Sequence, residues 1–153
     1  MKTSFGTLND GREAGLYTIT NGKGMTVALS DLGATLVKVL VPDRDGKETD
    51  VILGYDSAQG YIDNAFYFGA VIGRNGNRID KARFVIDGKT YQLAVNDNEN
   101  NLHSGPEGFE HRIWAAEQKA DNEVTFSLDS PEGDEGFPGC MHVEVTYTVT
   151  EDN

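Results

Sequence analysis

The chain has 153 residues, which is enough for one domain with a single hydrophobic core. Hydrophobic residues make up 38% and charged residues 25%, which is the composition of an ordinary globular protein. The 13 basic and 25 acidic residues give a net charge of −12. This charge argues against nucleic acid or an anionic membrane as the main partner, because both bind clustered lysine and arginine.

A single cysteine, Cys140, excludes an internal disulfide framework and leaves no Cys-x-x-Cys pair for zinc. The first residues, MKTSFGTLNDGREA, lack the apolar stretch of a signal peptide. No apolar run approaches the roughly 18 residues that a membrane-spanning helix needs. We therefore expect a soluble cytoplasmic protein without a membrane or nucleic-acid partner.

The first half of the chain alternates between short apolar-patterned runs and turns. LYTIT (16–20) and MTVALS (25–30) flank an Asn-Gly-Lys-Gly turn, which predicts a β-hairpin. ATLVKVLVP (34–42) and TDVILGY (49–55) predict two further strands on either side of an Asp-Arg-Asp-Gly turn. SAQGYIDNAF (57–66) has room for one or two helical turns.

The second half continues the same pattern. RFVID and KTYQLA predict a hairpin around Asp87-Gly88, and EVTFSLDS (123–130) predicts a strand. MHVEVTYTVT (141–150) alternates with period two and is followed by turn residues at 151–153. The strand is expected to lie at an edge that another strand covers, because an open edge promotes aggregation. Closely spaced strands with Gly, Asn and Asp turns indicate an all-β antiparallel sandwich.

GRNGNRID (73–80) resembles a nucleotide-binding loop only superficially. It matches neither the Rossmann nor the P-loop pattern, and no βαβ context surrounds it. One interpretation is a turn with two solvated arginines. In the other, Asn77 and Arg78 offer amide and guanidinium donors to a polyhydroxylated or anionic ligand, and Arg74 is a third donor or part of a buried ion pair.

His103, within NENNLHSGPEG, is the histidine best placed for chemistry. Its ordinary pKa lies near neutrality, and polar turn-rich loops often carry binding residues. The alternative is a surface or structural histidine. His111 is expected to be a surface or loop-packing residue, and His142 should be exposed on the polar face of its strand. The three histidines lack the spacing of a metal site.

Other candidates have simpler structural interpretations. Trp114, the only tryptophan, is expected in the core rather than stacked on a sugar. Cys140 has no neighbouring His or Lys and is expected to be inert. The acidic stretches at 43–46 and 131–136 match calcium loops only weakly, and turn chemistry explains them better.

Four stretches in order resemble the galactose mutarotase (aldose 1-epimerase) family. They are SDLGATLVKVLVPDRDGKETDVILGYD (30–56), GAVIGRNGNRIDKARFVIDGKTYQL (69–93), NENNLHSGPEGFEHRIW (98–114) and SPEGDEGFPGCMHVEVTYTV (130–149). The likeness covers nearly the whole chain. It implies an antiparallel β-sandwich of supersandwich type that interconverts the α and β anomers of free hexoses such as glucose and galactose, without metal or organic cofactor.

The resemblance assigns roles to single residues. Asn77 and Arg78 match the family's Asn-Arg pair and are implied to bind sugar hydroxyls. His103 matches the histidine of the Asn-Leu-His-Gly motif and is implied to be a catalytic residue that polarises the sugar near its ring oxygen. Ser104 stands where the family usually has glycine, so the backbone of this loop is expected to differ slightly.

Several family residues have no counterpart in the chain. A second histidine, a sugar-binding aspartate and a glutamate general base are expected beyond residue 153 by the resemblance. Residues 1–153 are thus expected to form the N-terminal portion of a single domain, completed by its C-terminal half or prone to self-association. Two alternatives stay open: a non-catalytic carbohydrate-binding sandwich, and a relative of hexose-phosphate epimerases in which Arg74 or Arg78 meets phosphate.

Overall fold

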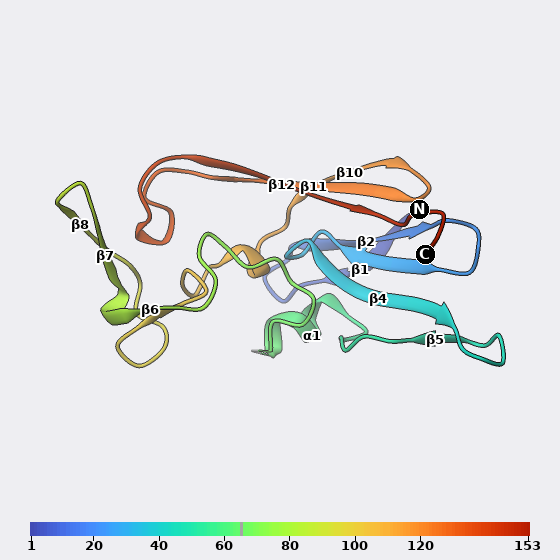
Figure 1. Ribbon diagram of the computed structural model, residues 1–153. Helices are drawn as coiled ribbons and strands as arrows, with labels where there is room; N and C mark the ends of the chain where they lie inside the picture. The colour runs from blue at the N-terminus through green and yellow to red at the C-terminus, as the bar shows by residue number, and fades with distance from the viewer. Residues whose placement is uncertain (65) are drawn as a thin grey trace.

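The computed structural model describes residues 1–64 and 66–153 as two facing antiparallel sheets with loops gathered at one end (Figure 1). The first sheet has its strands in chain order: β1 (Lys2–Thr7), β2 (Glu13–Thr20), β3 (Thr26–Ser30), β4 (Thr35–Pro42) and β5 (Glu48–Asp50). The second sheet has the order β10 (Ala115–Ala120), β11 (Glu123–Ser130) and β12 (Met141–Thr148). The predicted antiparallel sandwich is confirmed.

The first predicted hairpin is β2–β3. Its register pairs Ile19 with Val27, so buried side chains of both strands point to the same face. The turn is fixed by the Asn21 carboxamide, which accepts a hydrogen bond from the Lys23 amide at 2.8 Å. This local bond is the chemistry that makes asparagine a turn residue.

The strand predicted over 49–55 is wrong beyond its first residues, because β5 ends at Asp50. The Asp50 carboxylate accepts bonds from the amides of Val39 at 3.1 Å and Ile52 at 3.3 Å, which turns the chain out of the ladder. The following segment leads to α1 (Ala58–Asp63), whose N-cap Ser57 accepts from the Gly60 amide. The predicted helical turns at 57–66 are confirmed over these residues, and residue 65 lies outside the described part.

The main core lies between the two sheets. Tyr17 of β2 meets Phe126 of β11 edge-on, with ring centroids 5.6 Å apart. Trp114 is 2% exposed, and its indole nitrogen donates to the Phe109 carbonyl, which confirms it as a core residue. On β12 the alternate apolar side chains face this core, and within the described part of the chain β12 pairs with β11 alone, which places it at the edge of the second sheet.

Short paired segments occupy one end of the sandwich (Figure 1). β6 (Arg78–Ile79) pairs with β9 (Asn101–Leu102), and β7 (Arg83–Ile86) pairs with β8 (Lys89–Gln92) around the predicted Asp87-Gly88 turn. Three 3₁₀ turns lie in the connections: η1 (Asp80–Ala82) between β6 and β7, η2 (Phe109–His111) between β9 and β10, and η3 (Asp134–Gly136) between β11 and β12.

In the described ranges, no helix has the length and apolarity needed to cross a membrane.

Candidate functional site

The pairing of β6 with β9 brings the two predicted motifs together. Asn77 and His103 are joined by two hydrogen bonds. The backbone N–H of Asn77 donates to His103 Nδ1 at 2.9 Å, and the backbone N–H of His103 donates to the backbone carbonyl of Asn77 at 3.0 Å. Arg78 follows directly, opposite Leu102. Asn77, Arg78 and His103, which are distant in sequence, therefore form one cluster in space.

The bond at Nδ1 assigns the protonation state of His103. Because Nδ1 accepts from a backbone N–H, the neutral ring carries its proton on Nε2. Burial and, after it, the nearby Arg78 guanidinium lower the pKa of His103 below its ordinary value. At neutral pH the imidazole is thus a neutral hydrogen-bond donor through Nε2.

Three residues in and beside the cluster have a left-handed backbone conformation. Asn77, His103 and Ser104 have φ values of 65°, 53° and 76°. Asparagine tolerates this region better than most residues, whereas serine does so less readily. The cost of this conformation at the buried Ser104 is offset by two hydrogen bonds. Its hydroxyl accepts from the Asn75 backbone N–H at 2.7 Å and donates to the Asn75 carbonyl at 3.2 Å. Ser104 thus adopts a conformation that favours glycine and ties this loop to the loop before β6.

Arg78 is held in place by a residue that sequence reasoning missed. Its Nε donates to the Asp97 carboxylate at 2.6 Å, and its Nη1 donates to the Asn77 side-chain oxygen at 3.3 Å. The Arg78 side chain is still 53% exposed. Because the side-chain oxygen of Asn77 accepts from Arg78, the side-chain nitrogen of Asn77 is available as a donor. The pair can therefore offer donors to a hydroxyl-bearing ligand.

Arg74, for which the sequence leaves open both a third ligand donor and a buried ion pair, binds neutral protein acceptors. Its guanidinium donates to the carbonyls of Ser130, Pro131 and Pro138 and to the Ser130 hydroxyl, at 2.7–2.9 Å. These acceptors are neutral and lie at the end of β11 and in the loop between β11 and β12. Arg74 therefore ties that loop to the segment that carries the cluster.

Carboxylates in the two acidic turns accept hydrogen bonds from other groups of the protein. Asp134 receives two hydrogen bonds from Arg112, both at 2.7 Å, and also contacts the Ser130 hydroxyl. Asp43 accepts from the amides of Asp45 and Lys47, which confirms its turn role. In residues 1–64 and 66–153 no group of three or more His, Cys, Asp or Glu side chains is placed to hold a metal ion.

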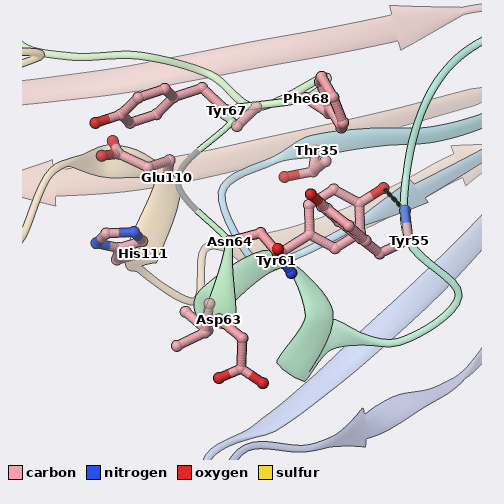
Figure 2. Close-up of a pocket in the computed structure, with 11 residues that line it drawn as sticks. Thr35, Tyr55, Tyr61, Asp63, Asn64, Tyr67, Phe68, Glu110 and His111 are labelled. Atoms are coloured by element: carbon pink, nitrogen blue, oxygen red, sulfur yellow. Dashed lines mark hydrogen bonds between the residues drawn. The ribbon is translucent and has the colours of Figure 1, made fainter.

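Two further residues beside the cluster were missed from sequence. The Tyr67 ring packs against the His103 imidazole with centroids 4.6 Å apart. Glu110, from η2, is only 7% exposed, and burial raises the pKa of its carboxyl. Both line a cavity of about 160 Å³ between η2 and α1 (Figure 2). The one signal in the sequence was the aromatic run at 66–68, directly before the GAVIGRNGNR motif.

The cavity adjoins the cluster without containing it. His103, Asn77 and Arg78 do not line it, and Tyr67 is the wall between the two. The geometry of donors at Asn77, Arg78 and His103 is the better guide to chemistry, because these groups face solvent on a shared loop surface.

The predicted positions of the other two histidines agree with the structure. His111 is half-buried in the loops, with Nδ1 2.8 Å from the Pro106 carbonyl. His142 is exposed on β12, 2.6 Å from the Asp129 carboxylate. Cys140 is exposed and free.

Comparison with known proteins identifies the family. The family model described as aldose 1-epimerase matches residues 15–153. The chain is 43% identical over 144 residues to an aldose 1-epimerase of Escherichia coli, covering 94% of this chain and 42% of that protein. It is also 43% identical over 148 residues to a galactose mutarotase of Rattus norvegicus, covering 97% of this chain and 43% of the relative.

Solved structures agree with the sequence matches. An aldose epimerase homologue from C. elegans superposes with a TM-score of 0.87 at 38% identity, covering 92% of this chain and 43% of its own. A galactose 1-epimerase from Lactobacillus acidophilus superposes with a TM-score of 0.84 at 25% identity, covering 100% and 45%. The chain thus has a galactose mutarotase-like fold and spans less than half the length of these relatives. Because the family model matches most of its residues, the chain belongs to the aldose 1-epimerase family.

Proposed function

We propose that the chain supplies part of the active site of an aldose 1-epimerase (mutarotase), which interconverts the α and β anomers of free hexoses such as glucose and galactose. The observation that carries the proposal is the cluster of Asn77, Arg78 and His103, in which the neutral imidazole presents an Nε2–H donor. A ring oxygen needs such a donor when it accumulates negative charge.

The reaction needs proton transfers at two oxygens. A base removes the proton of the anomeric hydroxyl, the bond between C1 and the ring oxygen breaks, and an acid protonates the ring oxygen. Rotation about the bond to C1 and closure on the other face give the second anomer. In this scheme His103 Nε2–H contacts the ring oxygen, and Asn77 and Arg78 hold neighbouring hydroxyls in place.

The general base is proposed to come from outside this chain. Asp97 is paired with Arg78, and the family glutamate has no counterpart in the sequence. We therefore propose that residues 1–153 act as the N-terminal portion of a single domain. A segment that supplies the second histidine, the aspartate and the glutamate would complete the site. The coverage of 42–43% of the E. coli and rat relatives supports this division.

The open side of the sandwich supports a completing partner. A groove of about 330 Å³ runs between the sheets next to the edge strand β12. Its walls are largely apolar and include Ile19, Val27, Leu36 and Val149. An edge strand beside an apolar groove is a surface on which further strands pair. The alternative occupant of this groove is a second copy of the chain. Light scattering of the isolated chain would detect the oligomers that form in that case.

Polarimetry of freshly dissolved α-D-glucose and α-D-galactose tests the proposal. The isolated chain is expected to accelerate mutarotation little, because loss of one acid–base group alone costs about 100- to 10,000-fold in rate. A chimera that continues residue 153 with the C-terminal portion of the E. coli relative is expected to restore the rate. Full activity of the isolated chain, or an inactive but folded chimera, would contradict the proposal.

A non-catalytic carbohydrate-binding role is the second candidate. The observation in its favour is that the hydroxyl-binding donors lie within the chain while the proposed base does not. A folded chimera that binds galactose without accelerating mutarotation would favour this candidate. The pairing of Arg78 with Asp97 and the net charge of −12 disfavour a phosphorylated sugar.

A further inference from the structure

We propose that Tyr67 is a positioning residue for His103 and that the buried carboxyl of Glu110 holds the Tyr67 ring in place. The assignment rests on the proposed function, because it concerns the imidazole that meets the sugar ring oxygen. It adds two residues, from the loop after α1 and from η2, to the three that belong to the β6–β9 pair.

The contact between Tyr67 and His103 is the tightest aromatic contact in the described ranges. The ring centroids are 4.6 Å apart at an interplanar angle of 68°, whereas the other aromatic pairs are separated by 5.2–6.1 Å. The Asn77 amide fixes the imidazole at Nδ1, and the Tyr67 ring fixes it from a second direction. Two such restraints leave Nε2 with one direction in which to donate.

The backbone holds Tyr67 in an uncommon conformation. Its φ is 52°, in the left-handed region that bulky residues avoid. The loop is attached to β4 by the Leu36 amide, which donates to the Gly69 carbonyl at 2.9 Å, and a turn within the loop is closed by the Ala70 amide, which donates to the Tyr67 carbonyl. Gly69 lies so close to Leu36 that a Cβ there would clash with the Leu36 carbonyl oxygen. Residues held in this way are frequent at functional sites.

Glu110 supplies the second half of the arrangement. Its Oε2 is buried without a hydrogen-bond partner among the described residues, which is costly for a carboxyl. Figure 2 shows the Tyr67 ring beside the Glu110 side chain, with the phenol and carboxyl ends on the same side. Burial, and next the Glu110 carboxyl, raise the pKa of the Tyr67 phenol, so the hydroxyl keeps its proton. The two groups are not hydrogen-bonded in the structure, but the phenol O–H is the kind of donor that the carboxyl oxygen lacks.

The consequence for the reaction is orientation of the donor. A displacement of about 1 Å in a reacting group can cost about 100-fold in rate, so an imidazole held on two sides is better oriented than one held by Nδ1 alone. Arg78 and Tyr67 are the charged or titratable groups that act on His103 directly, while Asp97 pairs with Arg78 and Glu110 acts on Tyr67. Of these, Tyr67 is the one whose ring contacts the imidazole.

Nitrogen-15 NMR of the His103 ring in the 153-residue chain tests the proposal without relying on enzyme activity. The wild type is expected to show one tautomer, with the proton on Nε2. Tyr67→Leu is expected to mix the tautomers and move the His103 pKa back toward its ordinary value, because the ring loses a packing partner. Tyr55→Leu is the matched control: it alters a tyrosine of the same cavity that does not contact His103, and it should leave the spectrum unchanged.

The Glu110 part is tested by a double-mutant cycle. Tyr67→Phe and Glu110→Leu remove the two ends of the proposed interaction, so each should shift the His103 signals in the same direction and the double variant little further. Additive shifts, or a Tyr67→Phe spectrum identical to the wild type, would overturn the role of Glu110. A folded Tyr67→Leu chain with an unchanged tautomer would overturn the role of Tyr67; if that variant unfolds, Tyr67→Met, which also removes the ring, gives the same test.

Activity of the chimera with the E. coli C-terminal portion gives a second readout. Tyr67→Leu is expected to lower kcat about tenfold or more with little change in KM, because it disturbs orientation rather than hydroxyl binding. The two failures are distinguishable. An inactive wild-type chimera defeats the proposed function while the tautomer result stands, whereas an unchanged tautomer defeats the positioning role even in an active enzyme.

Discussion

Replacing His103 by alanine is expected to lower the mutarotation rate of the complete domain by about 100- to 10,000-fold. The substitution removes the Nε2–H donor and leaves the Asn77 amide without its acceptor. The loss should appear mainly in kcat, because charge develops on the ring oxygen in the transition state and not in the bound sugar. Polarimetry of the chimera with glucose and galactose measures both parameters.

Two further variants separate chemistry from folding. His103→Gln retains an N–H donor on a side chain of similar reach and is expected to recover part of the activity. His142→Ala removes an exposed histidine on β12 and should leave the rate unchanged. If His103→Ala were as active as the wild type, the role proposed for this residue would be wrong.

The pH dependence of His103 follows from the direction of its pKa. The folded pKa lies below the ordinary value of about 6.5, so between the two values the unfolded chain binds more protons than the folded one. The contribution of His103 to stability therefore falls as the pH drops through this window. The neutral donor form, and the activity that depends on it, should persist to a pH below about 6.5.

Replacing Asp134 by alanine is expected to destabilise the chain by about 3 kcal/mol, because it breaks a largely buried ion pair. Its carboxylate accepts two hydrogen bonds from Arg112, and the two side chains are only 14% and 21% exposed. Removing the carboxylate leaves a partly buried guanidinium without its counter-charge. It also frees the η3 loop from the segment after η2. Urea unfolding followed by fluorescence of Trp114 measures the change.

Asp10→Asn is the matched control for this prediction. Asp10 and Arg12 are also 2.7 Å apart, but their side chains are 52% and 40% exposed. Solvent screens such a pair, so the substitution should change stability far less. A similar loss of stability for both variants would show that burial does not set the strength of these ion pairs.

The pH profile gives an independent check on Asp134. The hydrogen bonds from Arg112 lower the pKa of Asp134 below its ordinary value of about 3.9. Its stabilising contribution is thus complete above that value and is lost as the pH falls through the lower folded pKa. The difference in stability between wild type and Asp134→Ala should be constant near neutrality and should shrink only in strong acid.

The sequence predicts the elements whose register is fixed locally. The hairpins around Asn21 and Asp87, and the strand at 123–130, follow from period-two alternation and turn residues that lie next to one another in the chain. The strand predicted to continue past Asp50 is wrong, because side-chain bonds from Asp50 to two backbone amides end the ladder. Alternation alone carries no information about such competing bonds.

The candidate site could be predicted only in part. Asn77, Arg78 and His103 stand out because they lie in two motifs that resemble one family. Asp97, Tyr67 and Glu110 join the site through contacts between segments far apart in the chain, and no local pattern marks them. The sequence leaves two roles open for Arg74, and three backbone carbonyls of another loop determine its actual role.

The central claim is that this chain alone builds the surface that meets the sugar ring oxygen. A titration of the 153-residue chain with D-galactose, followed by nitrogen-15 NMR of side-chain nitrogens, tests it most directly. Saturable shifts are expected at His103 Nε2, the Asn77 amide and the Arg78 guanidinium, with smaller changes at Gln118, which lies on β10 in the second sheet. Saturable binding that shifts other residues and leaves His103 Nε2 unchanged would contradict the claim.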